Sequence, residues 1–239
     1  GKSFFFASNR KGGKGGTDLW MSTLDKSGVW LPPVNMGERL NTLGDEEAPY
    51  IAPDGVALYF SSNGHAGFGE ADIFRSVRQD DGSWSAPVNL GPAVNTPFRE
   101  AGIVISPDGK NAYFSSARDG GKGGLDIYEI AMQREIAPEF PNVMVDAYVY
   151  DAATKEPIKD VKVKIGKAGE QKQEFKTDKN GRFFACMPDN ASYSYILLNP
   201  GYETYVGAEF FKRREGEPTR KIEVFLIPTQ EKPVPKATS

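Results

Sequence analysis

The sequence Tyr59-Phe60-Ser61-Ser62-Asn63, with Asp72-Ile73-Phe74 after it, is the strongest indication of the fold, because both pieces recur with few changes every 54 residues. The register holds without a gap from residue 4 to residue 132. A fixed period of this kind marks an array of supersecondary units that bury their apolar faces on one another. The recurring positions include Asp18, Asp72 and Asp126; Trp30 and Trp84; Asn35 and Asn89; Asn41 and Asn95; and Glu46 and Glu100. We therefore expect the function to belong to an array and not to one closed pocket.

Each repeat is predicted to be a blade of four short antiparallel strands. In the second repeat, residues 57–61 are rich in strand-forming side chains and follow a Pro-Asp-Gly turn. Residues 72–77 mostly alternate apolar and polar side chains, as a half-buried strand does. A glycine-rich loop joins these strands, and residues 84–90 supply the outer strand. Four such strands without helical periodicity are typical of a propeller blade, although the repeat lacks the Trp-Asp signature of WD40 blades.

The motifs of the repeat resemble those of the TolB-like, or PD40, propeller family. The resemblance covers residues 3–132 and is repeated in register. It implies an exported protein, since repeats of this family occur in periplasmic and envelope proteins of Gram-negative bacteria. The motifs that carry it lie at residues 84–100, 106–109, 113–116 and 120–128.

The number of blades does not close a ring. The first repeat lacks its inner strand, and the position one period after Trp84 is Pro138, so the third repeat lacks its outer strand. Propellers need ~4–8 blades. We therefore expect residues 1–135 to form a partial β-propeller, about three blades of a larger ring. The sequence has no initiator Met, signal peptide or bilayer-spanning apolar run, and we expect it to be part of a longer protein, truncated at least at its N-terminus.

An incomplete third blade leaves a free strand edge. A row of unpaired backbone N–H and C=O groups is a template for pairing with another strand. We expect this edge, the strand Asp126–Met132, to pair with a segment upstream of Gly1 in the complete protein or with a partner chain. The candidate partner-pairing residues are Asp126, Ile127, Tyr128 and Ile130.

A second all-β domain is predicted after a linker at residues 136–142. Residues 143–228 contain about seven short strands with turns every 8–12 residues, which favours a β-sandwich. Asn180-Gly181 is a strong hairpin signal. Residues 229–239 have the composition of a Pro/Lys linker. The motifs of residues 151–163, 177–183 and 200–202 resemble the carboxypeptidase regulatory-like family, which implies a transthyretin-like (Ig-like) sandwich without catalytic residues.

Composition narrows the possible functions. The 239 residues suit two domains, and 29 basic against 32 acidic residues give a net charge of −3, which implies no nucleic-acid or anionic-membrane partner. The single cysteine, Cys186, excludes an internal disulfide, and its place in a predicted strand favours burial over reactivity.

We assign no catalytic, metal or cofactor residue. His65 occupies the loop position held by Lys11 and Asp119 in the other repeats, as an unconstrained site would, and no nucleophile–base pair is legible around it. One His and one Cys cannot form a zinc site. For the recurring aspartates, a turn-capping role is favoured over calcium binding, which stays open. The glycine-rich loops are expected to be flexible connections, because a P-loop requires Gly-Lys-Ser/Thr opening a helix.

The order of the domains resembles PorE-type, OmpA-family envelope lipoproteins of the type IX secretion system in Bacteroidetes. This resemblance implies a non-catalytic scaffold or protein-interaction module in the periplasm, associated with the outer membrane. Its expected partners are other envelope proteins, with peptidoglycan reached only through a domain that this sequence lacks. Two alternatives remain: a propeller glycosidase or peptidase whose active residues lie in missing blades, and a carbohydrate-binding surface module.

Overall fold

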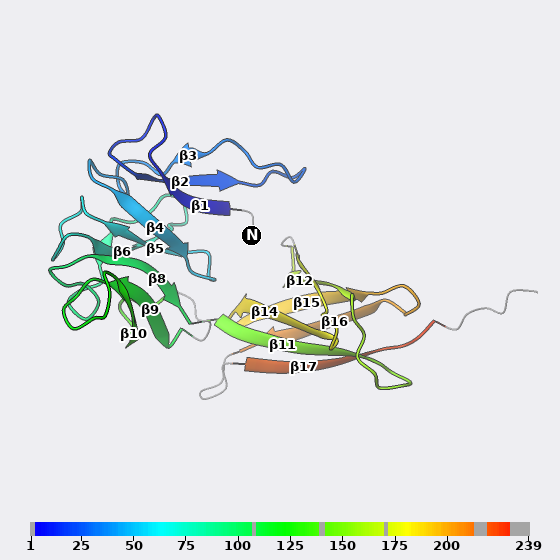
Figure 1. The fold of residues 1–239 in the computed structure, drawn as a ribbon. Coiled ribbons are helices and arrows are strands. Elements are labelled where there is room, and N and C mark those ends of the chain that lie inside the picture. The colour runs from blue at the N-terminus through cyan, green and yellow to red at the C-terminus, as the bar shows by residue number, and fades with distance from the viewer. Residues whose placement is uncertain (1–2, 107–108, 139–141, 170–171, 213–218, 230–239) are drawn as a thin grey trace, which may run out of the picture. The chain divides into compact units, whose positions relative to one another are not determined.

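A computed structural model of the chain is all-β, which confirms that part of the expected fold class. It describes residues 3–106, 109–138, 142–169, 172–212 and 219–229, and these contain strands β1 to β17 and no helix. Two predictions fall wholly or partly outside the described residues, the 229–239 linker and the 136–142 linker, as do residues 107 and 108 of one Pro-Asp-Gly turn. The chain divides into two compact units, Gly1–Asn142 and Val143–Ser239, called here the first and second domains (Figure 1).

The first domain contains three antiparallel sheets, one from each repeat. Each strand that has a counterpart recurs 54 residues further on, so the local sequence sets the same strand boundaries each time. Sheet 1 contains β1 (Ser3–Ser8), β2 (Asp18–Thr23) and β3 (Val34–Asn35). Sheet 2 contains β4 (Glu46–Ile51), β5 (Ala57–Ser62), β6 (Asp72–Val77) and β7 (Val88–Asn89). Sheet 3 contains β8 (Glu100–Ile105), β9 (Asn111–Ser116) and β10 (Asp126–Ala131).

Sheet 2 is buried on both faces, because sheets 1 and 3 pack on its two sides. Alternate side chains of each strand point to opposite sides, so one strand contributes to both cores. In β5, Phe60 packs toward sheet 1 and Tyr59 toward sheet 3. The core between sheets 1 and 2 includes Leu19, Leu40, Leu58, Phe60, Phe74 and Trp84. The core between sheets 2 and 3 includes Tyr59, Ile73, Leu90, Val94, Ile103 and Phe114. Each sheet therefore buries one face on the next in the same way.

The second domain has two sheets that contribute to one core. One sheet has the order β14-β11-β17, and the other has the order β13-β12-β15-β16. The pairing of β11 with β17 is parallel, whereas β12 pairs antiparallel with both of its neighbours. The bounds are β11 (Asn142–Asp151), β12 (Lys162–Lys167), β13 (Gln173–Lys176), β14 (Arg182–Pro188), β15 (Ala191–Leu198), β16 (Tyr205–Phe211) and β17 (Thr219–Leu226).

The hairpin predicted at Asn180-Gly181 is wrong, because β13 and β14 belong to different sheets. The turn itself forms, with Gly181 at a φ of +70°. However, the carbonyl of Gly181 accepts a hydrogen bond from the N–H of Val149 at 2.8 Å, which directs the chain to β11. A Cβ on Gly181 would lie 2.4 Å from the carbonyl oxygen of Val149. This close approach needs glycine, and it moves the chain from one sheet to the other.

Across the part of the chain that the structure describes, no helix has the length and apolar character that crossing a membrane requires.

Candidate binding sites

The three recurring aspartates lie in equivalent turns at the start of β2, β6 and β10. Asp72 accepts hydrogen bonds from the backbone N–H groups of Phe68, at 2.5 Å, and Gly69, at 3.2 Å. A short carboxylate that accepts backbone N–H bonds is a turn-stabilising group. The donors to the other two aspartates are Lys14 and Gly15 for Asp18, and Lys122 and Gly123 for Asp126.

These hydrogen bonds hold the glycine-rich loops in place, which corrects the expectation that the loops are flexible connections. A Cβ on Gly67 would lie 2.2 Å from Oδ2 and 2.7 Å from Cγ of Asp72. A Cβ on the equivalent Gly13 would lie 2.7 Å from Oδ2 of Asp18, and a Cβ on Gly121 would lie 2.1 Å from Oδ2 of Asp126. Glycine recurs at this position because the aspartate leaves no space for a side chain.

A second polar network joins each aspartate to the outer strand of its sheet. In sheet 2, Asn89 donates from Nδ2 to Oδ2 of Asp72 at 2.7 Å. Asn95 accepts from the N–H of Ile73 at 2.8 Å and donates to the carbonyl of Ile73 at 2.9 Å. Sheet 1 repeats these bonds with Asn35 on Asp18 and with Asn41 on the backbone of Leu19. The described residues contain no counterpart of these asparagines in sheet 3, where β10 is hydrogen-bonded to β9 alone.

Two recurring glutamates, Glu46 and Glu100, are fully buried and satisfied by neighbouring hydroxyl and backbone groups. Glu46 accepts from the N–H of Thr42 at 2.8 Å, from its Oγ1 at 2.7 Å, and from Oγ of Ser62 at 2.8 Å. The equivalent partners of Glu100 are Thr96 and Ser116, together with Arg118 in an ion pair at 3.6 Å. Sequence analysis identified these glutamates as recurring residues but gave them no role. The threonine four residues before each glutamate could have indicated this hydrogen bond.

The two recurring tryptophans occupy the same position in their sheets but different environments. Trp84 is 8 % exposed and packs edge-on against Phe5 of sheet 1, with ring centroids 6.0 Å apart. Trp30 is 49 % exposed, and its closest aromatic contact is with Phe4 of its own sheet at 6.2 Å. The surface around Trp30 is therefore a candidate binding site.

His65 is not an unconstrained loop residue, which corrects the sequence-based interpretation. Its Nε2 lies 2.9 Å from the carbonyl oxygen of Leu40, in the preceding repeat. Its ring also packs on Phe60 and Phe74, with centroids 5.9 and 5.2 Å away. His65 thus helps to join sheet 2 to the segment that follows β3.

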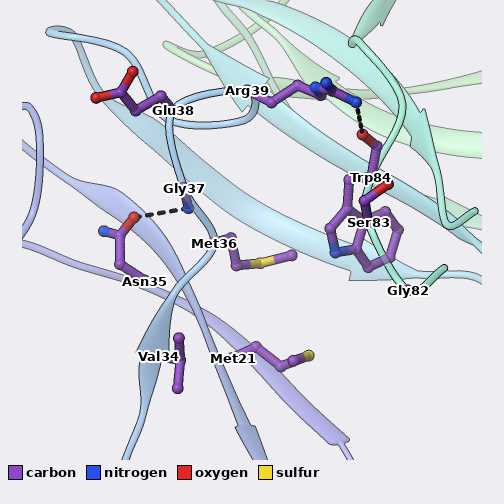
Figure 2. Close-up of a pocket in the computed structure, with 10 residues that line it drawn as sticks. All are labelled: Met21, Val34, Asn35, Met36, Gly37, Glu38, Arg39, Gly82, Ser83 and Trp84. Carbon is purple, nitrogen blue, oxygen red and sulfur yellow. Dashed lines mark hydrogen bonds between the residues drawn. The ribbon is translucent and has the colours of Figure 1, made fainter.

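A pocket of about 320 Å³ lies between the segments that flank β3 and the segment that precedes β7 (Figure 2). Met21, Met36 and Trp84 give it an apolar wall. Arg39 donates from Nη1 to the carbonyl oxygen of Trp84 at 3.0 Å and so connects the two segments. The shape of this pocket therefore depends on the contact between sheets 1 and 2. The other lining residues are Val34, Asn35, Gly37, Glu38, Gly82 and Ser83.

Burial shifts the pKa of two further titratable side chains, Tyr59 and Cys186. Burial raises the pKa of Tyr59, whose hydroxyl donates to the carbonyl oxygen of Ile136 at 2.7 Å. Burial also raises the pKa of the Cys186 thiol. Within the described ranges, no three His, Cys, Asp or Glu side chains gather as a metal ion would need.

Comparisons with known proteins return partial structural matches only. No family model matches the chain, and no curated protein matches it. The 3-chlorocatechol 1,2-dioxygenase of Rhodococcus opacus 1CP matches 37 % of this chain and 60 % of its own, at 14 % identity and a TM-score of 0.31. The catechol 1,2-dioxygenase of Acinetobacter sp. ADP1 matches 38 % and 54 %, at 11 % identity and a TM-score of 0.30. The C-terminal domain of the shaft pilin SpaA of Lactobacillus rhamnosus GG matches 37 % and 98 %, at 15 % identity and a TM-score of 0.28.

These findings overturn the resemblances drawn from the sequence. No family model supports TolB-like/PD40 repeats, a carboxypeptidase regulatory-like domain or a PorE-type lipoprotein, and the matched structures named above are two dioxygenases and a pilin domain. The aspartate, glycine and asparagine positions of these motifs are ones that the turns of this fold use for their own hydrogen bonds.

The functional expectations built on those resemblances are corrected by the same matches. The expectations of a non-catalytic scaffold of the type IX secretion system and of a chain that is not an enzyme do not agree with the matched structures named above, two of which are dioxygenases. The chain spans about three fifths or less of the length of the dioxygenases named above. At TM-scores near 0.3, the likeness carries no argument for dioxygenase chemistry in this chain.

Proposed function

We propose that the first domain binds a peptide segment by adding a strand to the edge of β10. The observation that carries this proposal is the difference between sheet 3 and its two predecessors. Sheet 3 has the three strands and the aspartate turn of sheet 2, but the described residues hold no counterpart of β7 beside β10. An exposed strand edge binds an extended segment through main-chain hydrogen bonds, while side-chain contacts give specificity.

The complete sheets indicate the chemistry of the missing segment. In sheet 2, Val88 and Asn89 pair with Arg75 and Phe74, and in sheet 1 the same Val-Asn dipeptide pairs with β2. An asparagine six residues further on then holds the backbone of β6. A segment with valine, asparagine and a second asparagine at this spacing would complete sheet 3 in the same way.

The β10 edge offers the matching groups. Asp126 would accept from the first asparagine, as Asp72 does from Asn89. The backbone N–H and C=O of Ile127 would meet the second asparagine, as those of Ile73 do in sheet 2. Tyr128 and Ile130 pack on the core between sheets 2 and 3, so the strand is anchored while its edge receives the segment.

A peptide of residues 84–96 of this chain tests the proposal directly. It contains the outer strand and both asparagines of the second repeat. Fluorescence anisotropy of the labelled peptide with the full chain should show saturable binding. The control peptide, with Asn89→Ala and Asn95→Ala, should bind at least about tenfold more weakly, because two hydrogen-bonding side chains are lost.

A protein variant separates this edge from non-specific binding. Ile127→Pro removes an N–H group that the segment would use, and proline is tolerated at the edge of a sheet. We expect it to abolish binding of the wild-type peptide without unfolding the domain, as monitored by tryptophan fluorescence. Equal affinity for both peptides, or unchanged binding by the proline variant, would refute strand addition at β10.

The finer fold is part of the same proposal. We propose that the three sheets of the first domain, which each bury a face on the next, are neighbouring blades of a partial β-propeller. Two sheets around one core in the second domain are consistent with a β-sandwich. The periplasmic, outer-membrane-associated location and the envelope-protein partners remain predictions.

A further inference from the structure

The outer face of sheet 1, which points away from sheet 2, is an open apolar surface. Phe4 stacks on Phe6 with ring centroids 5.4 Å apart and meets Trp30 edge-on. Arg10 lies over the ring of Phe6 at 4.6 Å, which gives the surface one cationic border. We call this surface face A. It forms a groove of about 720 Å³ lined by Phe4, Phe6, Arg10, Ser22, Trp30, Leu31, Pro32 and Pro33.

The same positions in sheet 2 are buried by a neighbouring sheet. Leu58 is the equivalent of Phe4 and is 0 % exposed, whereas Phe4 is 57 % exposed. Trp84 is covered by Phe5 of sheet 1, and its equivalent Trp30 is half exposed. Face A is therefore a surface that this repeat normally buries against another sheet.

The opposite end of the array presents the complementary surface. Ile127 of sheet 3 is 80 % exposed, whereas its equivalent Ile73 is fully buried against sheet 3. Val104 and Tyr113 are also exposed on this sheet, and their equivalents Tyr50 and Tyr59 pack on the core between sheets 2 and 3. We call this second surface face B, defined by Val104, Tyr113 and Ile127.

We infer that a second copy of this chain docks its face B on face A. The chain already makes this type of contact twice within itself, between sheets 1 and 2 and between sheets 2 and 3. Face A is equivalent to the surface of sheet 2 that packs on sheet 1, and face B is equivalent to the surface of sheet 2 that packs on sheet 3. Large exposed apolar surfaces mark interaction sites, and aromatic side chains contribute much of the energy of such contacts.

The contact is head-to-tail, because different surfaces of the two copies meet. A heterologous interface of this kind closes into a ring if the rotation allows it and extends into a filament if it does not. Either outcome makes association dependent on protein concentration.

Sedimentation velocity of the full chain over a range of concentrations tests the inference. The wild-type protein should shift from monomer to dimer or larger species as its concentration rises. Trp30→Ser on face A and Ile127→Ser on face B should each weaken association at least tenfold. Both side chains are substantially exposed, so both variants should retain the folded circular-dichroism spectrum. Val206→Ser, at an exposed position of the second domain, is the matched control and should associate like the wild type.

Mixing the two variants gives the decisive readout. The Trp30→Ser protein keeps face B, and the Ile127→Ser protein keeps face A. An equimolar mixture should therefore form a heterodimer at a concentration where each variant alone is monomeric. A monomeric wild type at every concentration would overturn the inference. Association that survives both substitutions, or that mixing fails to restore, would overturn the head-to-tail contact.

The two proposals can fail independently. Strand addition uses the backbone edge of β10, whereas face B uses the side chain of Ile127. Val104 lies on face B but outside β10, so the Val104→Ser variant should weaken self-association and still bind the peptide of residues 84–96.

Discussion

His65 and Arg118 make the same contact in successive repeats, although they are different residues at neighbouring positions of the register. Arg118 donates from Nη2 to the carbonyl of Val94 at 2.5 Å and lies over the rings of Phe114 and Tyr128. His65 meets the carbonyl of Leu40 and the equivalent rings of sheet 2. The second repeat has Gly64 at the position equivalent to Arg118. The imidazole of the next residue, His65, makes the contacts that the guanidinium of Arg118 makes in the third repeat.

Replacing His65 by alanine should destabilise the first domain by about 1–2 kcal/mol, through loss of one hydrogen bond and two ring contacts. Lys11→Ala, at the equivalent exposed position of the first repeat, is the control and should change little. All three tryptophans, Trp20, Trp30 and Trp84, lie in the first domain, so urea unfolding followed by tryptophan fluorescence reports on that domain alone. Equal stability of the two variants would show that His65 makes no net contribution.

Adding one methyl group to Gly67 should be costly. The new Cβ would lie 2.2 Å from the carboxylate of Asp72, which is held by its own hydrogen bonds. We expect Gly67→Ala to lower the free energy of unfolding by about 1–3 kcal/mol, as overpacking does. Gly123→Ala lies in the equivalent loop of sheet 3, with no atom within 4 Å of the new Cβ, and should be nearly neutral. Similar urea midpoints for the two variants would contradict the role assigned to the aspartate turn.

The stability of the second domain should depend on Asp151 in acid. Hydrogen bonds from the backbone N–H of Thr154 and from the hydroxyl of Tyr202 lower the pKa of Asp151 from its ordinary value of 3.8. Because the folded-state pKa is the lower one, the stabilisation is present above pH 3.8 and is lost as the pH falls through the folded-state pKa.

Tyr202→Phe should therefore raise the pKa of Asp151 toward its ordinary value, but not fully, since the Thr154 bond is retained. Carbon-13 NMR titration of the carboxyl groups measures this change. Asp178, whose pKa is lowered mainly by the backbone N–H of Arg182, is the internal control and should not move. An unchanged titration of Asp151 would mean that the Tyr202 hydroxyl does not stabilise the carboxylate.

Cys186 should react slowly with alkylating reagents in the folded protein. Burial raises the pKa of its thiol, and the thiolate is the reactive form. We expect alkylation by iodoacetamide at pH 8 to be much slower in buffer than in urea, measured by mass spectrometry. Equal rates under the two conditions would show that the folded protein does not shield this half-buried thiol.

The local features of this protein could be predicted from its amino-acid sequence. The 54-residue period and the strand boundaries follow from short-range chemistry, namely alternating side chains, Pro-Asp-Gly turns and aspartates that accept hydrogen bonds from N–H groups three or four residues earlier. The approximate positions of the seven strands of the second domain were predictable for the same reason. Resemblance to known families was a poorer guide, since no family model matches the chain.

Which faces of the sheets are covered could not be predicted from the sequence and became clear from the packing of the sheets. Trp30 and Trp84 are indistinguishable by register, yet one is open and the other buried, because burial depends on whether another sheet lies against that face. The sequence also did not predict the role of His65, or the passage of the chain at Gly181 from the sheet of β13 to a different sheet. Each depends on contacts between residues more than 20 positions apart, His65 with Leu40 and Gly181 with Val149, and no local pattern in the sequence records such a contact.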